Sequence, residues 1–181
     1  MAKTPIALAQ VMGRWQLGKA LSLLALIPLF GLASNQAPAC RLTVLGDSLT
    51  AGYGVSLDAA FPAQLERALR AVGLACRVQN AGVSGDTTAG GRARLEWVLA
   101  DAPTHLVVQL GGNDALRALP VEQLEANLAA IIEVAQARGI AVMLAGMLAP
   151  PNLGADYAQA FAAVYQRLAE RYRVPLYPFF L

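Results

Sequence analysis

From residue 40 onward, short apolar runs alternate with longer amphipathic segments. The apolar runs have the length of β-strands and lie at 42–45, 74–79, 105–110, 140–146 and 174–177. Strands that are buried on both faces and connected by helices form parallel sheets with right-handed crossovers. The pattern therefore predicts an α/β fold, a three-layer α/β/α sandwich around a five-stranded parallel sheet.

Two of the segments between the strands carry an apolar stripe of helical period. The first begins after Pro120, ends at Gly139, and has its apolar positions at Leu124, Leu128, Ile131, Ile132 and Ala135. The second places Tyr157, Phe161, Val164, Leu168 and Tyr172 on one face. We expect these faces to pack in the core rather than to bind a ligand.

Polar, glycine-containing loops follow the first three predicted strands. They read "GDSLTAG" (46–52), "NAGVSGDTT" (80–88) and "GGND" (111–114). In open parallel sheets, ligands bind beyond the carboxyl ends of the strands. Because all three loops fall at that edge, the sequence predicts that they converge on one site.

The first 39 residues have the order of an export signal. A basic stretch ending at Lys19 precedes an apolar run at 20–33, and the small residues "APA" (37–39) follow. The run is shorter than the ~20 residues of a membrane-spanning helix. We therefore expect 1–39 to be a signal peptide, the mature chain to begin near Cys40 without stable membrane insertion, and the protein to be periplasmic or secreted. An uncleaved membrane anchor is the alternative.

Charge and composition narrow the function classes. Lys3, Arg14 and Lys19 are the only charged residues before residue 40, so the rest has 11 arginines against 12 acidic residues. This near-neutral body, of single-domain size, lacks the basic stripe that nucleic-acid binding needs. One histidine and two cysteines cannot build a conventional zinc site. Whether Cys40 and Cys76 form a disulfide stays open, because sequence cannot test the required geometry.

Ser48 is the candidate nucleophile, although "GDS" is also a common turn sequence. A serine nucleophile needs donors for an oxyanion and a base that accepts its proton. Gly85 offers a backbone amide that no side chain obstructs, and Asn113 offers a neutral carboxamide. We assign Asp47 and Asp114 to loop scaffolding, because a carboxylate beside a developing oxyanion would oppose its charge.

Four blocks together, "LGDSLTAGYG", "NAGVSGDTTAGGRARL", "VVQLGGNDALR" and "VPLYPFFL", resemble the SGNH (GDSL) hydrolase family. The resemblance covers residues 42–181 and implies a flavodoxin-like hydrolase domain at 40–181. It implies Ser48 as the nucleophile, with Gly85 and Asn113 as oxyanion donors. It further implies a monomer that forms an acyl-enzyme without cofactor or metal. Its substrates would be small-molecule acyl esters, thioesters or lysophospholipids.

The sequence departs from this family in the residue that would act as the catalytic base. Members carry an Asp-x-x-His motif after the fifth strand, and no such motif occurs here. The only histidine, His105, precedes Gly111 by six residues, which places it roughly 20 Å away at the other end of a strand. We expect a domain incomplete at its C-terminus, with the last helix missing, apolar sheet surface uncovered and little activity.

Two alternatives complete the sequence-based interpretation. A non-catalytic acyl-binding or scaffold protein derived from such a hydrolase would keep the pocket without the base. A nucleotide-binding module is disfavoured, because the loops match neither G-x-G-x-x-G nor G-x-x-x-x-G-K-[ST]. In either case, "MLAPPNLG" (147–154) is predicted to border the pocket, with Leu153 where relatives often have tyrosine.

Overall fold

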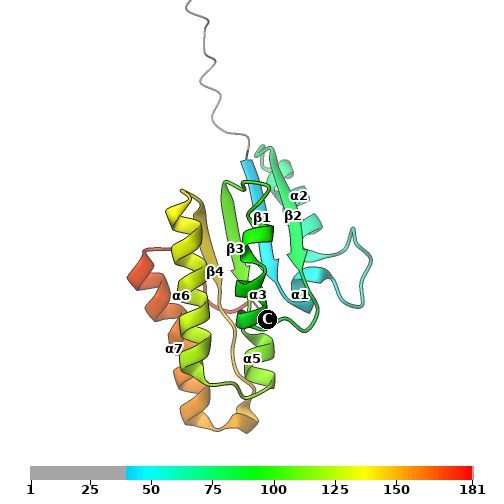
Figure 1. Cartoon of the computed structure of the whole chain (residues 1–181). Coiled ribbons are helices and arrows are strands. Elements are labelled where there is room, and N and C mark those ends of the chain that lie inside the picture. The colour runs from blue at the N-terminus through cyan, green and yellow to red at the C-terminus, as the bar shows by residue number, and fades with distance from the viewer. Residues whose placement is uncertain (1–39, 181) are drawn as a thin grey trace, which may run out of the picture. The chain divides into compact units, whose positions relative to one another are not determined.

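The computed structural model describes residues 40–180, so the predicted signal peptide lies outside the described residues. Five strands form one parallel sheet in the order β2-β1-β3-β4-β5 (Figure 1). Their bounds are β1 Cys40–Gly46, β2 Cys76–Gly82, β3 His105–Gln109, β4 Ala141–Ala145 and β5 Leu176–Tyr177. The predicted five-stranded α/β sheet is confirmed.

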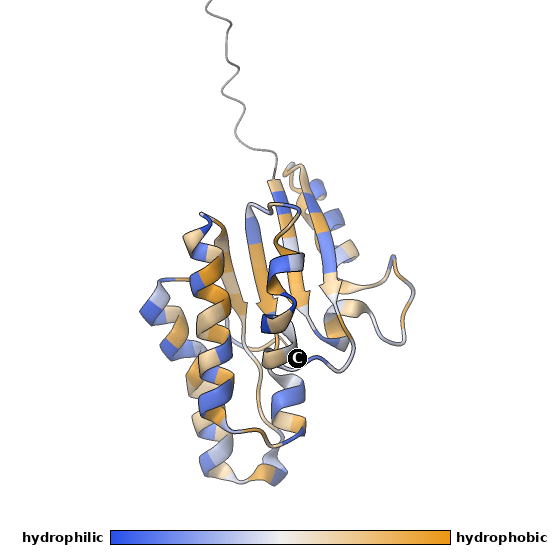
Figure 2. Cartoon of the chain, viewed as in Figure 1, coloured by the Kyte–Doolittle hydropathy of each residue, from blue (hydrophilic) through white to orange (hydrophobic). Residues whose placement is uncertain are grey.

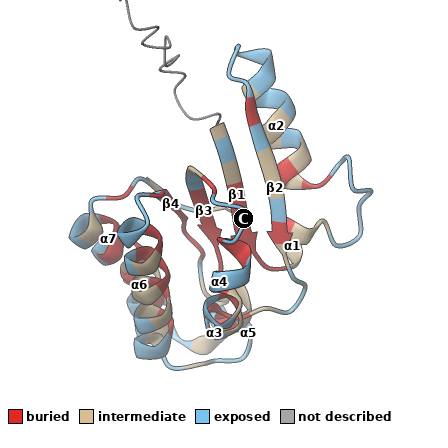
Figure 3. Ribbon diagram, turned by 45° about the horizontal axis from the view of Figure 1, so that its top comes forward, coloured by how far each residue is buried: buried red, intermediate tan, exposed pale blue. Residues whose placement is uncertain are grey.

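Helices cover both faces of the sheet and make the predicted three layers. They are α1 Ser48–Ala51, α2 Phe61–Ala71, α3 Thr88–Ala93, α4 Leu95–Val98, α5 Gly112–Leu116, α6 Val121–Ala137 and α7 Ala155–Tyr172, with the 3₁₀ helix η2 at Pro151–Leu153. Helices α4, α6 and α7 pack into the main core on one face, and α2 packs on the other (Figure 3).

The main core lies between the sheet and α6 and α7. Every apolar position predicted for α6 is buried, as expected. In α7 the buried stripe also includes Tyr165 and Ala169, whereas Tyr157 and Tyr172 are only half-buried. The hydropathy colouring shows the same division, with apolar strands at the centre and polar outer helix faces (Figure 2).

The opposite face of the sheet carries a smaller apolar cluster under α2. Val44, Val107 and Ala145 are its buried members. Beside α2, a groove of about 540 Å³ runs over this face, lined by Leu49, Phe61, Leu65, Val107, Met143, Ala145, Tyr177 and Phe180. The lining is mostly apolar, with the Tyr177 side chain as its one member that carries a hydroxyl.

Strand β2 lies later in the chain than the hydrophobic run at 74–79 predicts. Leu74 is exposed in the turn before the strand, and the strand continues through Gln79 and Asn80 to Gly82. The reason is that β2 is an edge strand, where polar side chains face solvent and do not mark the strand by hydropathy. Its register is set by pairing with β1, residue for residue, from Cys40↔Cys76 to Gly46↔Gly82.

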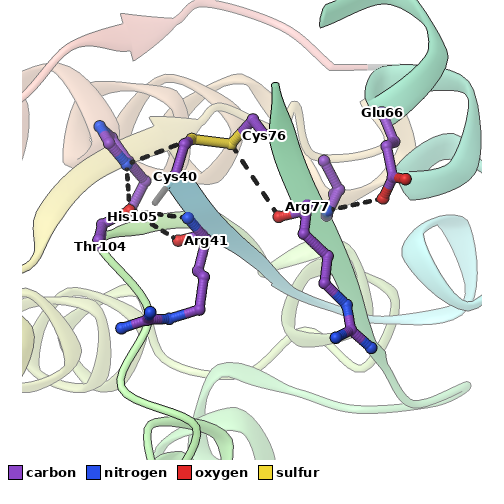
Figure 4. The surroundings of a disulfide bond; sticks show 8 residues. Cys40, Arg41, Glu66, Cys76, Arg77, Thr104 and His105 are labelled. Carbon is purple, nitrogen blue, oxygen red and sulfur yellow. Dashed lines mark hydrogen bonds between the residues drawn. A yellow bond between two sulfur atoms is a disulfide. The ribbon is translucent and has the colours of Figure 1, made fainter. Parts of the chain in front are cut away.

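Cys40 and Cys76 form a disulfide at the first register position of β1 and β2, with their Cα atoms 4.5 Å apart (Figure 4). The bridge joins the edge strand to its neighbour at the amino ends of the strands. It answers the pairing question that the sequence left open. Within residues 40–180, no helix is long and apolar enough to cross a membrane.

Candidate active site

Ser48 is the first residue of α1, directly after the carboxyl end of β1. Asp47 caps this helix, because its side chain accepts a hydrogen bond from the Leu49 amide at 3.0 Å. The one-turn helix ends at Gly52, which takes the left-handed conformation. Ser48 is half-buried and lines a hollow of about 270 Å³ together with Leu49 and the loop before α2. The strand-to-helix turn therefore presents the serine to a small cavity.

Gly85 lies in the loop between β2 and α3. Its φ of +86° is in the region that favours glycine, and a Cβ there would meet only the Arg117 Nη2 atom, 3.8 Å away. In the described part of the chain, the Gly85 amide has no hydrogen-bond acceptor. The loop thus leaves this backbone amide open, and its role as an oxyanion donor stays a prediction.

Asn113 is the second residue of α5, after the carboxyl end of β3. Its Nδ2 donates to the Asp86 carbonyl at 2.9 Å, which fixes the carboxamide beside the Gly85 loop. Gly111 precedes it with φ of +117°, and a Cβ there would lie 1.9 Å from the Tyr165 hydroxyl. Close packing of this loop against α7 therefore requires glycine.

The two acids near the site serve as scaffolding in the structure. Asp114 is buried, and its carboxylate accepts from the Thr88 amide at 2.8 Å and the Thr88 hydroxyl at 2.5 Å. Asp114 therefore ties the loop after β3 to the start of α3. Asp47 is equally buried and holds the first turn of α1.

Burial raises the pKa of Asp47 above its ordinary value of 3.8, and the nearby Asp86 charge adds to the increase. Hydrogen bonds from the Leu49 amide and the Gln109 side chain act in the opposite direction. Desolvation dominates because the carboxylate has little contact with water.

Two arginines that the sequence interpretation missed support the loops. Arg94 Nε contacts Asp86 Oδ2 at 2.6 Å, and its Nη2 donates to the Gly46 carbonyl at 3.0 Å. Arg117 Nη2 donates to the Gly85 carbonyl at 2.8 Å. Each is the residue that caps a short helix, Arg94 after α3 and Arg117 after α5. Both lie within the quoted sequence blocks, but the sequence alone gave no chemical reason to single out these arginines.

His105 lies at the opposite end of the strands from Ser48. It begins β3, is exposed, and has its Nδ1 2.8 Å from Thr104 Oγ1 and 4.0 Å from Cys40 Sγ (Figure 4). The structure therefore confirms that His105 is a strand-end residue remote from the site. Among residues 40–180, no cluster of histidine, cysteine and acidic side chains could hold a metal ion.

The segment 147–154 follows β4 and contains η2. Met147 is buried, and its Sδ lies 3.9 Å from Gln109 Nε2 beneath the loop after β3. Leu153 is half-buried at the end of η2. That 147–154 borders a substrate pocket stays a prediction.

The loops that follow β1, β2 and β3 therefore lie together at the carboxyl edge of the sheet. Residues 44–181 match the model of the GDSL-like lipase/acylhydrolase family. The chain belongs to the GDSL-like lipase/acylhydrolase family. Its parallel sheet matches solved structures of SGNH hydrolases.

Relatives of this GDSL-like chain carry hydrolase names. Esterase TesA of Pseudomonas aeruginosa is 44% identical over 151 residues, covering 83% of this chain and 75% of TesA. Thioesterase 1/protease 1/lysophospholipase L1 of Escherichia coli K12 is 40% identical, covering 83% and 71%. The crystal structure of AlinE4, an SGNH-hydrolase family esterase, is 48% identical with a TM-score of 0.77, covering 80% and 78%. The family and these names place the chain among the hydrolases.

Proposed function

We propose that the chain is a serine hydrolase of small acyl esters or thioesters, including lysophospholipids, with Ser48 as its nucleophile. One observation carries the proposal: Asn113 donates to the carbonyl of Asp86, the residue after Gly85, so both proposed oxyanion donors lie together. The names of the relatives support the same reaction class. The protein would act as a monomer and without a cofactor.

In the proposed reaction, Ser48 Oγ bonds to the acyl carbon while its proton passes to a base. Negative charge then develops on the former carbonyl oxygen. The amides of Gly85 and Ser48 and the Asn113 carboxamide would stabilise it, each donor contributing about 3–4 kcal/mol. Collapse releases the protonated alcohol or thiol, and water cleaves the acyl–Oγ bond to give the acid and restore Ser48.

No histidine within residues 40–180 is positioned to act as the base for Ser48. His105, the only histidine of the sequence, lies at the amino ends of the strands and cannot reach Ser48. The serine proton would therefore pass to solvent water, which is a poor acceptor at neutral pH. Loss of the histidine in subtilisin lowers kcat by about 10⁶-fold, so we infer that turnover is weak.

The test compares the chain with Ser48→Ala on p-nitrophenyl butyrate, with circular dichroism to confirm that both fold. We expect slow hydrolysis that Ser48→Ala reduces further. Joining the Asp-x-x-His segment of a relative after residue 181 should then raise the Ser48-dependent rate, because a histidine can accept the proton. In that chimera, Asn113→Ala should lower kcat by about 10²–10³-fold. A folded chimera without Ser48-dependent turnover contradicts the proposal.

Acyl binding without catalysis is a second candidate, favoured by the apolar groove beside α2. Its lining residues Leu49 and Phe61 also line the Ser48 hollow, so an acyl chain could lie there. Isothermal titration with a short fatty acid separates the two candidates. If the chain and the chimera both bind the fatty acid and neither hydrolyses the ester, acyl binding is favoured over hydrolysis.

We further propose that the protein is exported and works in the periplasm or outside the cell. The disulfide between Cys40 and Cys76 supports this location, because disulfides persist in oxidising compartments. The basic and apolar order of residues 1–39 supports it as well. Intact-mass analysis of periplasmic protein should show a chain that begins near Cys40, and a mass that retains Met1 would contradict export with cleavage.

A further inference from the structure

We propose that Arg94 is a positioning residue that sets the geometry of the Ser48 centre by holding all three site loops. The inference rests on the proposed function, since it assigns a task to Arg94 within that site. The observation behind it is that the Arg94 side chain contacts both the Gly46 carbonyl and the Asp86 carboxylate.

Arg94 connects the first two loops directly. Its Nη2 donates to the Gly46 carbonyl at 3.0 Å, and Gly46 precedes Ser48 by two residues. Its Nε donates to Asp86 Oδ2 at 2.6 Å, and Asp86 directly follows Gly85. The planar guanidinium therefore fixes the spacing between the nucleophile loop and the Gly85 loop, as its rigid fork of donors allows.

The third loop joins through Asp86. The backbone carbonyl of Asp86 accepts from Asn113 Nδ2 at 2.9 Å, while its carboxylate is held by Arg94. A displacement of Asp86 would therefore move the Asn113 carboxamide as well as Gly85. One ion pair thus controls the relative positions of all three proposed reaction groups.

The helix beside this ion pair leaves room for it. A Cβ on Gly90 would lie 2.7 Å from Asp86 Oδ1, so a larger residue there would displace the carboxylate from its present position. The two side chains are 18% and 17% exposed, which limits screening by water. Arg94 Nη1 is buried without a hydrogen-bond partner among the described residues. An ion pair with such an unpaired nitrogen adds little net stability, so positioning explains it better than stabilisation.

The test uses the full chain with three substitutions. Arg94→Met removes the charge and donors but keeps an unbranched side chain, and Arg94→Lys keeps the charge with a single donor group. Arg92→Met is the matched control, because Arg92 is exposed and makes one hydrogen bond, to Asn127. If Arg94→Met fails to fold, Asp86→Asn replaces it, since this change weakens the pair and keeps the Asp86 carbonyl.

The first measurement is independent of activity. In ¹⁵N-labelled protein, Arg94→Met should shift the Asn113 side-chain amide and the Gly85 backbone amide, with Arg94→Lys intermediate. Arg92→Met should leave both signals in place. Signals unchanged in Arg94→Met and in Asp86→Asn would overturn the positioning role, whatever the chain hydrolyses.

The second measurement is hydrolysis of p-nitrophenyl butyrate by the same variants in the chimera that carries the Asp-x-x-His segment, because the chain itself is expected to turn over only weakly. Arg94→Met should lower kcat by about 10- to 100-fold with KM changed less than about threefold, because displaced donors lose contact with the developing oxyanion. A Ser48-dependent rate that Arg94→Met does not reduce refutes the role in catalysis. A rate that is the same in Ser48→Ala refutes the proposed function instead, and the amide signals then decide the positioning role.

Discussion

Asp47 and Asp114 have the same side chain, but their carboxylates accept hydrogen bonds from different segments of the backbone. Asp47 caps α1, and Asp114 receives two hydrogen bonds from Thr88. Both side chains are buried. Their hydrogen bonds hold the first turn of α1 and tie the loop after β3 to the start of α3.

Asp47→Asn should reduce the loss of stability that accompanies rising pH. The folded pKa of Asp47 lies above the unfolded value, so the folded state holds the proton more tightly. Its stabilising effect is full below the unfolded pKa and is lost as pH rises through the folded pKa. Asparagine keeps an oxygen for the Leu49 amide but does not titrate. Urea unfolding of both proteins between about pH 3.5 and pH 7 measures this difference. Parallel curves for the two proteins would contradict the shift.

The sequence was sufficient to propose Ser48, Gly85 and Asn113, since each belongs to a motif with a chemical reason for its residue type. It did not reveal Arg94 or Tyr165. A lone arginine usually indicates a solvated position, and a tyrosine beside an apolar stripe usually indicates core. What distinguishes these two is the backbone carbonyl that each one reaches, which depends on tertiary structure alone.

At the scale of elements, α7 supports the loop that carries Asn113. The Tyr165 hydroxyl donates to the Leu110 carbonyl at 2.8 Å and contacts the position where Gly111 lacks a side chain. Burial raises the pKa of Tyr165 well above its ordinary value, so the hydroxyl stays protonated and keeps donating. Helix and loop are therefore joined by a hydrogen bond inside the core.

Tyr165→Phe should lower the free energy of unfolding by about 1–3 kcal/mol, because the buried Leu110 carbonyl loses its donor. Urea denaturation measures this loss. Tyr172→Phe serves as control, since the Tyr172 hydroxyl bonds the exposed Glu133 carboxylate and should matter by less than about 1 kcal/mol. An equal decrease in the free energy of unfolding for both variants would contradict a larger contribution from the buried hydrogen bond.

Long helices, in which the hydrophobic period repeats several times, were predictable from the sequence, and short helices were not. Helix α6 matches its predicted face because 17 residues repeat the 3.6-residue spacing several times. Helices α1 and α4 have four residues each, too few for any period to show. Strand β2 was misplaced because its exposed side is polar. The site loops therefore had to be predicted from motifs rather than from hydropathy.

On the scale of the whole molecule, the two ends of the sheet are chemically different. The amino ends of β1, β2 and β3 carry the disulfide and His105, and the carboxyl ends carry the three site loops. This polarity follows from parallel topology, which the alternation of strands and helices already predicted. The distance of His105 from Ser48 was predictable for the same reason.

Reduction of the Cys40–Cys76 bridge should lower the free energy of unfolding by about 4 kcal/mol, since it closes a loop with a sequence separation of 36. The stabilisation comes mainly from restricting the unfolded chain. Guanidinium unfolding with and without a phosphine reductant gives the value. A Cys40→Ser, Cys76→Ser double variant should match the reduced protein, and equal stability of all three forms would contradict the estimate.

The same bridge makes residues 40–76 a covalent ring that contains Ser48, while Gly85 and Asn113 lie outside it. The loop between α1 and α2 belongs to the ring and exposes Tyr53 and Leu57, at 82% and 83%. Limited chymotrypsin digestion there would open the ring without releasing a fragment. A non-reducing gel would then show one band of full size, and a reducing gel a shorter band for the fragment that carries Cys76. Nicked protein would therefore pass a non-reducing purity check, and without reduction it would be recognised by a mass increased by one water.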